Sequence, residues 1–139
     1  MGWAVTVAAA SLFVSGCSKA DATVPDPNNA THCIAAFNWG AYWFSLASPQ
    51  HVPDRQGVAR MLAHARYELD KIKASGGSVE NAREKGAELT RLFADDGDKL
   101  TVLMRDCSKA HADDPEFRRQ WPDLVSWAQA EAARYPTHK

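Results

Sequence analysis

Two cysteines and two histidines are the residues of this chain with the most definite chemistry. Cys33 follows His32 directly, whereas Cys107 and His111 are four residues apart and share one face of an expected helix. Two thiolates and two imidazoles form a tetrahedral ligand set of the kind that binds zinc. However, His32 and Cys33 diverge by about 100° on a helix, which makes them poor ligands for one ion. We therefore expect no metal and no other cofactor, and keep the site of His32, Cys33, Cys107 and His111 as an alternative.

The same two cysteines are more simply interpreted as one disulfide. In an oxidising compartment an isolated pair of cysteines normally forms such a bond. Bonding Cys33 to Cys107 would close a loop of about 75 residues, and a loop of that length stabilises the fold by about 4 kcal/mol in the chain-entropy model. Two free, buried thiols are the alternative.

The remaining patterns do not indicate catalysis. The sequence contains no Gly-x-Ser-x-Gly, no His-Glu-x-x-His, no glycine-rich phosphate loop and no Cys-x-x-Cys-His haem motif. The aspartates around Gly97 lack the alternating ligands and the distal glutamate of a calcium loop. A net charge of −1 without a basic block gives no reason to expect nucleic acid as a partner. We predict a protein that is not an enzyme and does not bind nucleic acid.

Apolar residues dominate the chain from Trp3 to Val14 and lead into the tetrapeptide Val14-Ser15-Gly16-Cys17. Crossing a bilayer takes about 20 apolar residues, so this stretch is too short for a transmembrane helix. Its length is typical of the apolar region of an export signal. The tetrapeptide resembles the lipobox of bacterial lipoprotein precursors.

The resemblance implies a signal peptide over residues 1–16 that is removed, and a lipid anchor on Cys17 that holds the protein to a membrane. Ser18, in place of an acidic residue, implies retention in the outer membrane of the cell envelope, with the protein facing the periplasm. Residues 17–30 have almost nothing to bury, which predicts a flexible, lipidated tether. Residues 31–139 then form a single domain.

Helical periodicity covers this domain and predicts an all-α fold, a small bundle of four to five helices with a long third helix. The first helix, capped by Thr31, is apolar on nearly every side, which is typical of a central helix. On the second helix, Glu68 falls among the charged residues of a solvated face, and His64 is a single polar residue. The expected ranges are about 31–47, 54–76, 78–111, 114–119 and 123–135.

The third helix admits two arrangements. Its heptad pattern continues through the run from Asp95 to Asp98, which favours one unbroken helix. In a simple up-and-down bundle that helix would carry Cys107 to the end opposite Cys33, yet a disulfide needs Cα atoms within about 7 Å. Either the helix breaks near Gly97, or it overhangs and the first helix packs obliquely across it. We expect the overhang.

Aromatic residues offer the remaining candidate site. The cluster of Trp39, Tyr42, Trp43 and Phe44 can fill the core or form an exposed patch, and Trp127 poses the same choice. We take Trp39, Trp43 and Trp127 as a candidate interface with an unknown protein partner. The predicted function is that of an envelope lipoprotein acting by protein contact, as an assembly subunit, an inhibitor or immunity-type protein, or a chaperone. The alternative is a bundle that binds a metal, haem or another small ligand.

Overall fold

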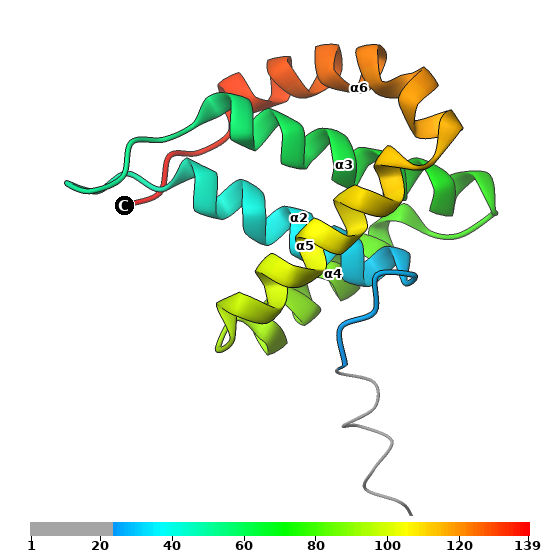
Figure 1. Cartoon of the computed structure of the whole chain (residues 1–139), viewed down its shortest axis with the longest axis horizontal. Coiled ribbons are helices and arrows are strands. Elements are labelled where there is room, and N and C mark those ends of the chain that lie inside the picture. Colours follow the sequence, from blue (N-terminus) through cyan, green and yellow to red (C-terminus); the bar gives the residue numbers. More distant parts are fainter. Residues whose placement is uncertain (1–23) are drawn as a thin grey trace, which may run out of the picture.

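A computed structural model describes residues 24–139, and this part of the chain is all-α, as predicted. It holds no strand, only isolated bridges. Within it, no helix combines the length and the apolar character needed to cross a bilayer. The predicted signal peptide, Cys17 and the first part of the predicted tether lie outside the described residues. The helices, labelled as in Figure 1, are α2 (Ala30–Ser45), α3 (Arg55–Ala74), α4 (Val79–Phe93), α5 (Gly97–Ala112) and α6 (Pro115–Arg134).

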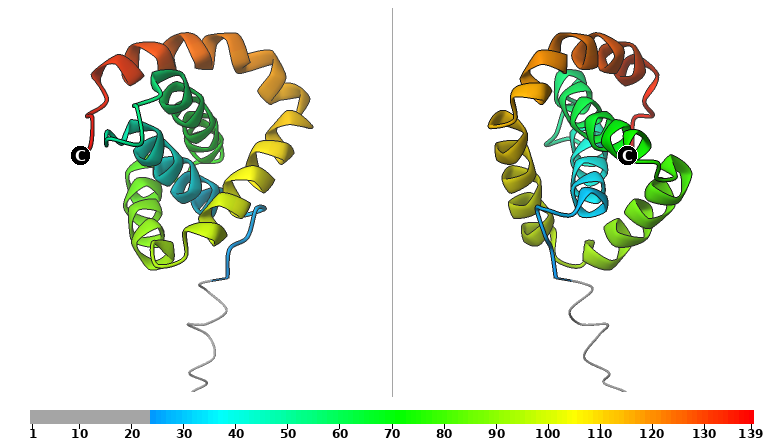
Figure 2. Two further views of the ribbon diagram at one scale, coloured as in Figure 1. Left: turned by 60° about the vertical axis from the view of Figure 1, so that its left-hand side comes forward. Right: turned by 90° about the vertical axis from the view of Figure 1, so that its right-hand side faces the viewer.

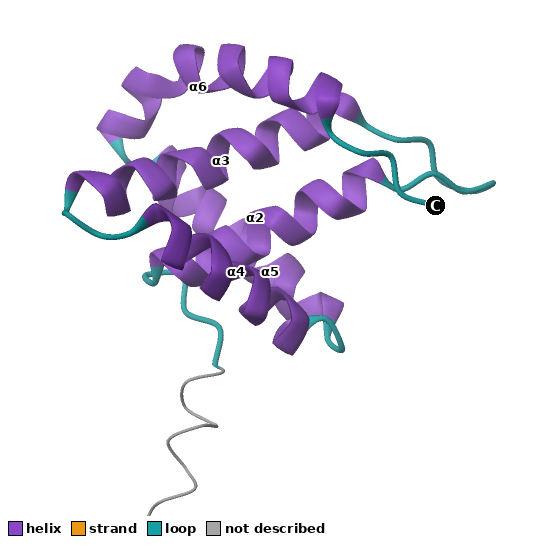
Figure 3. Ribbon diagram, turned by 180° about the vertical axis from the view of Figure 1, so that it is seen from behind, coloured by secondary structure: helices purple, strands orange, loops and turns teal. Residues whose placement is uncertain are grey.

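Helix α2 lies at the centre, as its apolar surface predicts. It packs against α3, α4 and α5, whereas α6 packs mainly against the far side of α3 (Figures 1 and 3). A Cβ atom on Gly40 would lie 2.6 Å from Sδ of Met104 on α5 and 2.8 Å from Sδ of Met61 on α3. The missing side chain therefore lets three helices approach one another closely.

Side-chain caps explain where the helices begin. Ser78 and Asp114 accept hydrogen bonds from backbone N–H groups at the starts of α4 and α6, as predicted, and Asp54 does so for α3. The predicted cap Thr31 is wrong. Asn29 holds that place, because its Oδ1 accepts from the N–H groups of Thr31 and His32 at 3.0 and 3.3 Å.

The long third helix is also wrong, because the chain breaks between Phe93 and Gly97. The side chain of Asp96 accepts from the N–H of Lys99 and so starts a new helix, α5. The apolar repeat is kept across the break, but α4 and α5 meet at a corner (Figure 2). Local capping thus determines where the helices begin and end, whereas the apolar repeat determines only which side chains face the core.

The opposite error occurs near the C-terminus. The two predicted helices 114–119 and 123–135 are one helix, α6, which runs through Pro122 and is curved (Figure 2). Proline removes one helical hydrogen bond and normally bends a helix rather than ending it when both flanks stay packed. Phe117 and Leu124, on either side of Pro122, are both buried in the core, and this packing keeps the helix continuous.

The predicted disulfide is confirmed. Cys33 on α2 and Cys107 on α5 are bonded, with their Cα atoms 5.8 Å apart and both residues almost fully buried. The break before Gly97 makes this possible, because it lets α5 turn back across the N-terminal half of α2 (Figure 2). The bond joins the central helix α2 to α5. Helix α5 makes few contacts with α4, the helix that precedes it in the chain.

Candidate functional site

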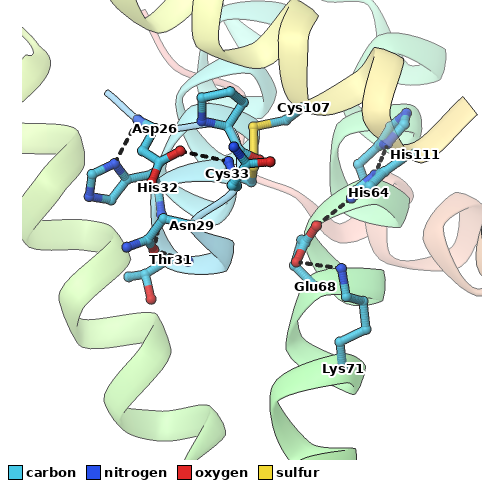
Figure 4. The surroundings of a disulfide bond; sticks show 12 residues. Asp26, Asn29, Thr31, His32, Cys33, His64, Glu68, Lys71, Cys107 and His111 are labelled. Carbon is cyan, nitrogen blue, oxygen red and sulfur yellow. Dashed lines mark hydrogen bonds and ion pairs between the residues drawn. A yellow bond between two sulfur atoms is a disulfide. The ribbon is translucent and has the colours of Figure 1, made fainter. Parts of the chain in front are cut away.

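The two histidines next to the disulfide lie on opposite sides of it (Figure 4). The Nδ1 atom of His32 accepts from the N–H of Asp26 at 3.0 Å, and its ring meets the edge of Phe93. His111 instead faces α3. The structure therefore does not bring His32, Cys33, Cys107 and His111 together as metal ligands, since the sulfurs are bonded to each other and the imidazoles diverge.

His111 belongs to a buried network with two residues of α3. Its Nδ1 lies 2.7 Å from Nδ1 of His64, and its Nε2 donates to the carboxylate of Glu68. Lys71 approaches from the surface, and its Nζ atom lies 3.4 Å from the other carboxylate oxygen of Glu68. We call His64, Glu68 and His111 the buried histidine network. It links the middle of α3 to the last turn of α5.

The network is enclosed by aromatic rings. His64 stacks on Phe37 of α2 and Phe117 of α6 with ring centroids 4.7 and 4.9 Å apart, and Trp121 lies 5.4 Å away. Burial therefore lowers the pKa of His64 to about 3, helped by the neighbouring His111 and the cation of Arg60. One proton can occupy the bond between the two Nδ1 atoms, so a second proton would meet direct repulsion.

A second polar link lies beside the network. The hydroxyl of Tyr67 donates to Asp114 at 2.5 Å, and Asp114 also caps α6. Burial, this hydrogen bond and nearby carboxylates raise the pKa of Tyr67, and the hydrogen bond lowers the pKa of Asp114. Helix α3 is thus fixed to the junction between α5 and α6 by two neighbouring contacts.

The chemistry open to the buried histidine network is limited. Among residues 24–139 neither imidazole contacts a hydroxyl or thiol that it could activate as a nucleophile. His111 lies between its two partners, so the three side chains do not converge on a common point. In the described part of the chain no group of three or more histidine, cysteine or acidic side chains is arranged to hold a metal ion. The network can hold a proton and fix helices.

The placement of Glu68 corrects the sequence prediction. Glu68 was expected on a solvated face, but it is 4% exposed. His64 and Glu68 are one helical turn apart, a spacing that puts two side chains on one face. This spacing of His64 and Glu68 was the sequence signal that could have predicted a shared position for the two side chains. His111 lies on the same face of α5 as the buried Cys107, so its imidazole is buried as well. A buried imidazole requires a polar partner inside the fold.

A serine and a histidine meet at the other end of α2 without forming a catalytic pair. Ser45 Oγ lies 2.7 Å from Nδ1 of His138 and donates its only hydrogen to the carbonyl of Tyr42 at 2.6 Å. His138 Nδ1 must therefore carry the hydrogen between them, so it cannot accept a proton from Ser45. Ser45 is also fully buried, which excludes attack on a substrate.

These contacts instead hold the C-terminal segment. The N–H of Ala47 donates to the carbonyl of His138 at 2.7 Å. Arg55, at the start of α3, donates to the carbonyls of Ala132 and Tyr135 at 3.0 and 2.6 Å and so satisfies the end of α6. The C-terminal segment is therefore held at the end of α2 and at the start of α3.

Aromatic side chains are exposed at the C-terminal end of α2. Trp39 and Trp43 stack with ring centroids 6.0 Å apart, Trp39 against the core and Trp43 outermost. Trp43 is 51% exposed and Tyr42 is 44% exposed. Trp43 also lies near His51 of the following loop, and Tyr42 lies over His138. We call Trp39, Tyr42 and Trp43 the aromatic end of α2.

Trp127 does not belong to this surface. It is partly buried on α6, where the guanidinium of Arg66 lies 4.7 Å from its ring centroid. Trp127 lines a surface hollow with residues of α3 and α6, whereas Trp39 packs toward Gly97 at the start of α5. The candidate interface of Trp39, Trp43 and Trp127 is thus two separate places.

No family model, curated protein or solved structure matches the chain. The aromatic end, the buried histidine network and the surroundings of Trp127 are therefore interpreted from their geometry.

Proposed function

We propose that this chain is a lipoprotein of the cell envelope, anchored to the outer membrane through Cys17 and facing the periplasm, that acts by binding another protein and not by catalysis. The observation that carries the proposal is the aromatic end of α2. Tryptophan and tyrosine are enriched at the energetic centres of protein interfaces. Leaving two large aromatic side chains half exposed costs apolar burial that a partner would recover.

The position of these residues suits a tethered protein. The chain enters the domain through residues 24–29, at the N-terminal end of α2 (Figure 1). The aromatic end is at the other end of the same helix, and Trp43 lies about 20 Å along the helix axis from Ala30. An anchor at Cys17 would hold the first end near the membrane, and the aromatic end would then point away from it.

The rigidity of the aromatic end favours contact with a partner. The neighbouring backbone is fixed by hydrogen bonds of Ser45, His138 and Arg55. The ring of Trp39 stacks on that of Trp43 and supports it from the core side. A preformed surface loses little conformational entropy on binding, which improves affinity for a given contact area. An assembly subunit, an inhibitor or immunity-type protein and a small chaperone would all use such a surface.

Photocrosslinking in the native cells tests the proposal. With p-benzoylphenylalanine in place of Trp43, we expect one discrete crosslinked species on denaturing gels. The same amino acid in place of Arg118, exposed on α6, is the matched control and should give none. With the partner identified, Trp43→Ala should weaken its binding about 30-fold, since an interface tryptophan contributes about 2 kcal/mol. Equal crosslinking at both positions, or unchanged affinity of Trp43→Ala, would contradict the proposal.

A further inference from the structure

A groove of about 500 Å³ runs along α3, with α2 and α4 on one flank and α6 on the other. Its floor is apolar and includes Ile34, Leu62 and Leu69, and Trp127 and Tyr135 line the α6 side. We call it the α3–α6 groove. Its volume is within the range of about 300–1,000 Å³ that small-molecule sites occupy.

Positive charge surrounds this apolar floor. The groove is lined by Arg66, Arg83 and Arg134, against one acidic residue, Glu131. Arg66 is paired with Asp70 at 2.9 Å, and Arg134 is paired with Glu131. Within residues 24–139, Arg83 has no carboxylate within ion-pairing distance. A guanidinium at the edge of an apolar groove is thus free to receive an anion.

Two further polar groups line the groove. The amide of Asn38 and the hydroxyl of Tyr135 make no side-chain hydrogen bond to another residue in the described part of the chain. Burial raises the pKa of Tyr135, so its hydroxyl keeps its hydrogen at neutral pH. Both groups can therefore donate to an oxygen anion bound in the groove.

We propose that the α3–α6 groove binds a free single-chain amphiphile with one carboxylate, that is, a fatty acid, with its chain on the apolar floor and its carboxylate at Arg83. A helical peptide fits less well. The floor from Leu62 to Leu69 is only about 10 Å long. This is too short to bury the area of about 800 Å² that each side of a stable protein interface buries. This site is independent of the aromatic end of α2.

The test uses the whole protein, purified with its disulfide intact, and three probes with the same chain length: dodecanoate, dodecyltrimethylammonium and dodecanol. Each is titrated below its micelle concentration while the indole N–H signals are followed by NMR. The Trp127 signal is assigned with Trp127→Phe. We expect dodecanoate to shift the Trp127 signal and leave that of Trp43 unchanged, and to bind at least ten-fold more tightly than the cationic probe.

The Arg83→Gln variant separates the anion site from general apolar binding. Arg83 is exposed, so its replacement should leave the fold intact, and circular dichroism checks this. We expect Arg83→Gln to weaken dodecanoate about ten-fold, as loss of a charge-assisted hydrogen bond predicts, and Arg118→Gln to leave it unchanged. Absence of a Trp127 shift, equal binding of the cationic or neutral probe, or an unchanged affinity of Arg83→Gln would overturn the proposal. So would sedimentation and NMR data showing the groove covered by a second copy of the chain.

Discussion

Replacing both Cys33 and Cys107 by alanine is expected to lower the free energy of unfolding by about 4 kcal/mol. The bond closes a loop across a sequence separation of 74, and the entropy of the unfolded chain rises when that loop is opened. Small domains are stable by only about 5–15 kcal/mol, so the variant should lose a large part of its stability. Urea unfolding followed by tryptophan fluorescence gives the measurement.

The reduced wild-type protein is the control for this variant. Its unfolding midpoint in dithiothreitol should fall to that of the double alanine variant, because both lack the same loop constraint. The native contacts of α5 with α2 would remain in both. A loss below about 1 kcal/mol, or no effect of the reductant, would mean that the bond constrains the unfolded chain far less than its loop length implies.

Acidification from pH 7.5 to pH 5 is expected to destabilise the protein through His64. The pKa of His64 is lowered to about 3 in the folded state, mainly by burial, and returns to the ordinary histidine value of 6.5 on unfolding. Between these values the unfolded chain binds one more proton, so stability falls as the pH falls. The slope approaches about 1.4 kcal/mol per pH unit, which amounts to about 2 kcal/mol at pH 5.

The groups that face His64 determine how much of the pH dependence of stability can be assigned to His64 itself. His111, Glu68 and Arg60 are its charged or titratable neighbours, and the aromatic rings of α2 and α6 complete its surroundings. Burial also lowers the pKa of His32, which adds a contribution of the same sign. The lowered pKa of Asp114 affects stability only below about pH 4, and the raised pKa of Tyr67 only above about pH 10.

Urea unfolding at several pH values between 7.5 and 5 provides the measurement, with His64→Gln as the matched control. Glutamine can still hydrogen-bond His111 but does not titrate. We expect the stability of this variant to vary much less with pH than that of the wild type. An equally steep pH dependence in His64→Gln would show that other groups are responsible.

Much of the architecture follows from local sequence signals. The helical class, the caps Ser78 and Asp114, the central place of α2 and the disulfide were all predictable, because each depends on a few residues with strong preferences. The break before Gly97 and the continuity through Pro122 were not. In both cases two signals conflicted, a periodic pattern against a cap or a proline, and the packing of the whole fold decided between them.

The buried histidine network shows the same limit at the level of side chains. Glu68 sits among charged residues in the sequence, and only the crossing of α3 by α5 reveals that it faces His111. Likewise, the distance between Trp127 and the Trp39–Trp43 pair depends on which side of α3 each helix packs. Spacing within one helix can be read from the sequence, whereas partners on different helices require the fold.

The proposed function depends on export and lipid attachment at Cys17, and an intact-mass measurement tests this most directly. The protein would be isolated from the membranes of its native cells and alkylated before and after reduction. The account predicts a chain that begins at acylated Cys17, lacks residues 1–16 and takes up two alkyl groups only after reduction. A chain that retains residues 1–16, carries no lipid and is alkylated at all three cysteines without reduction would contradict it.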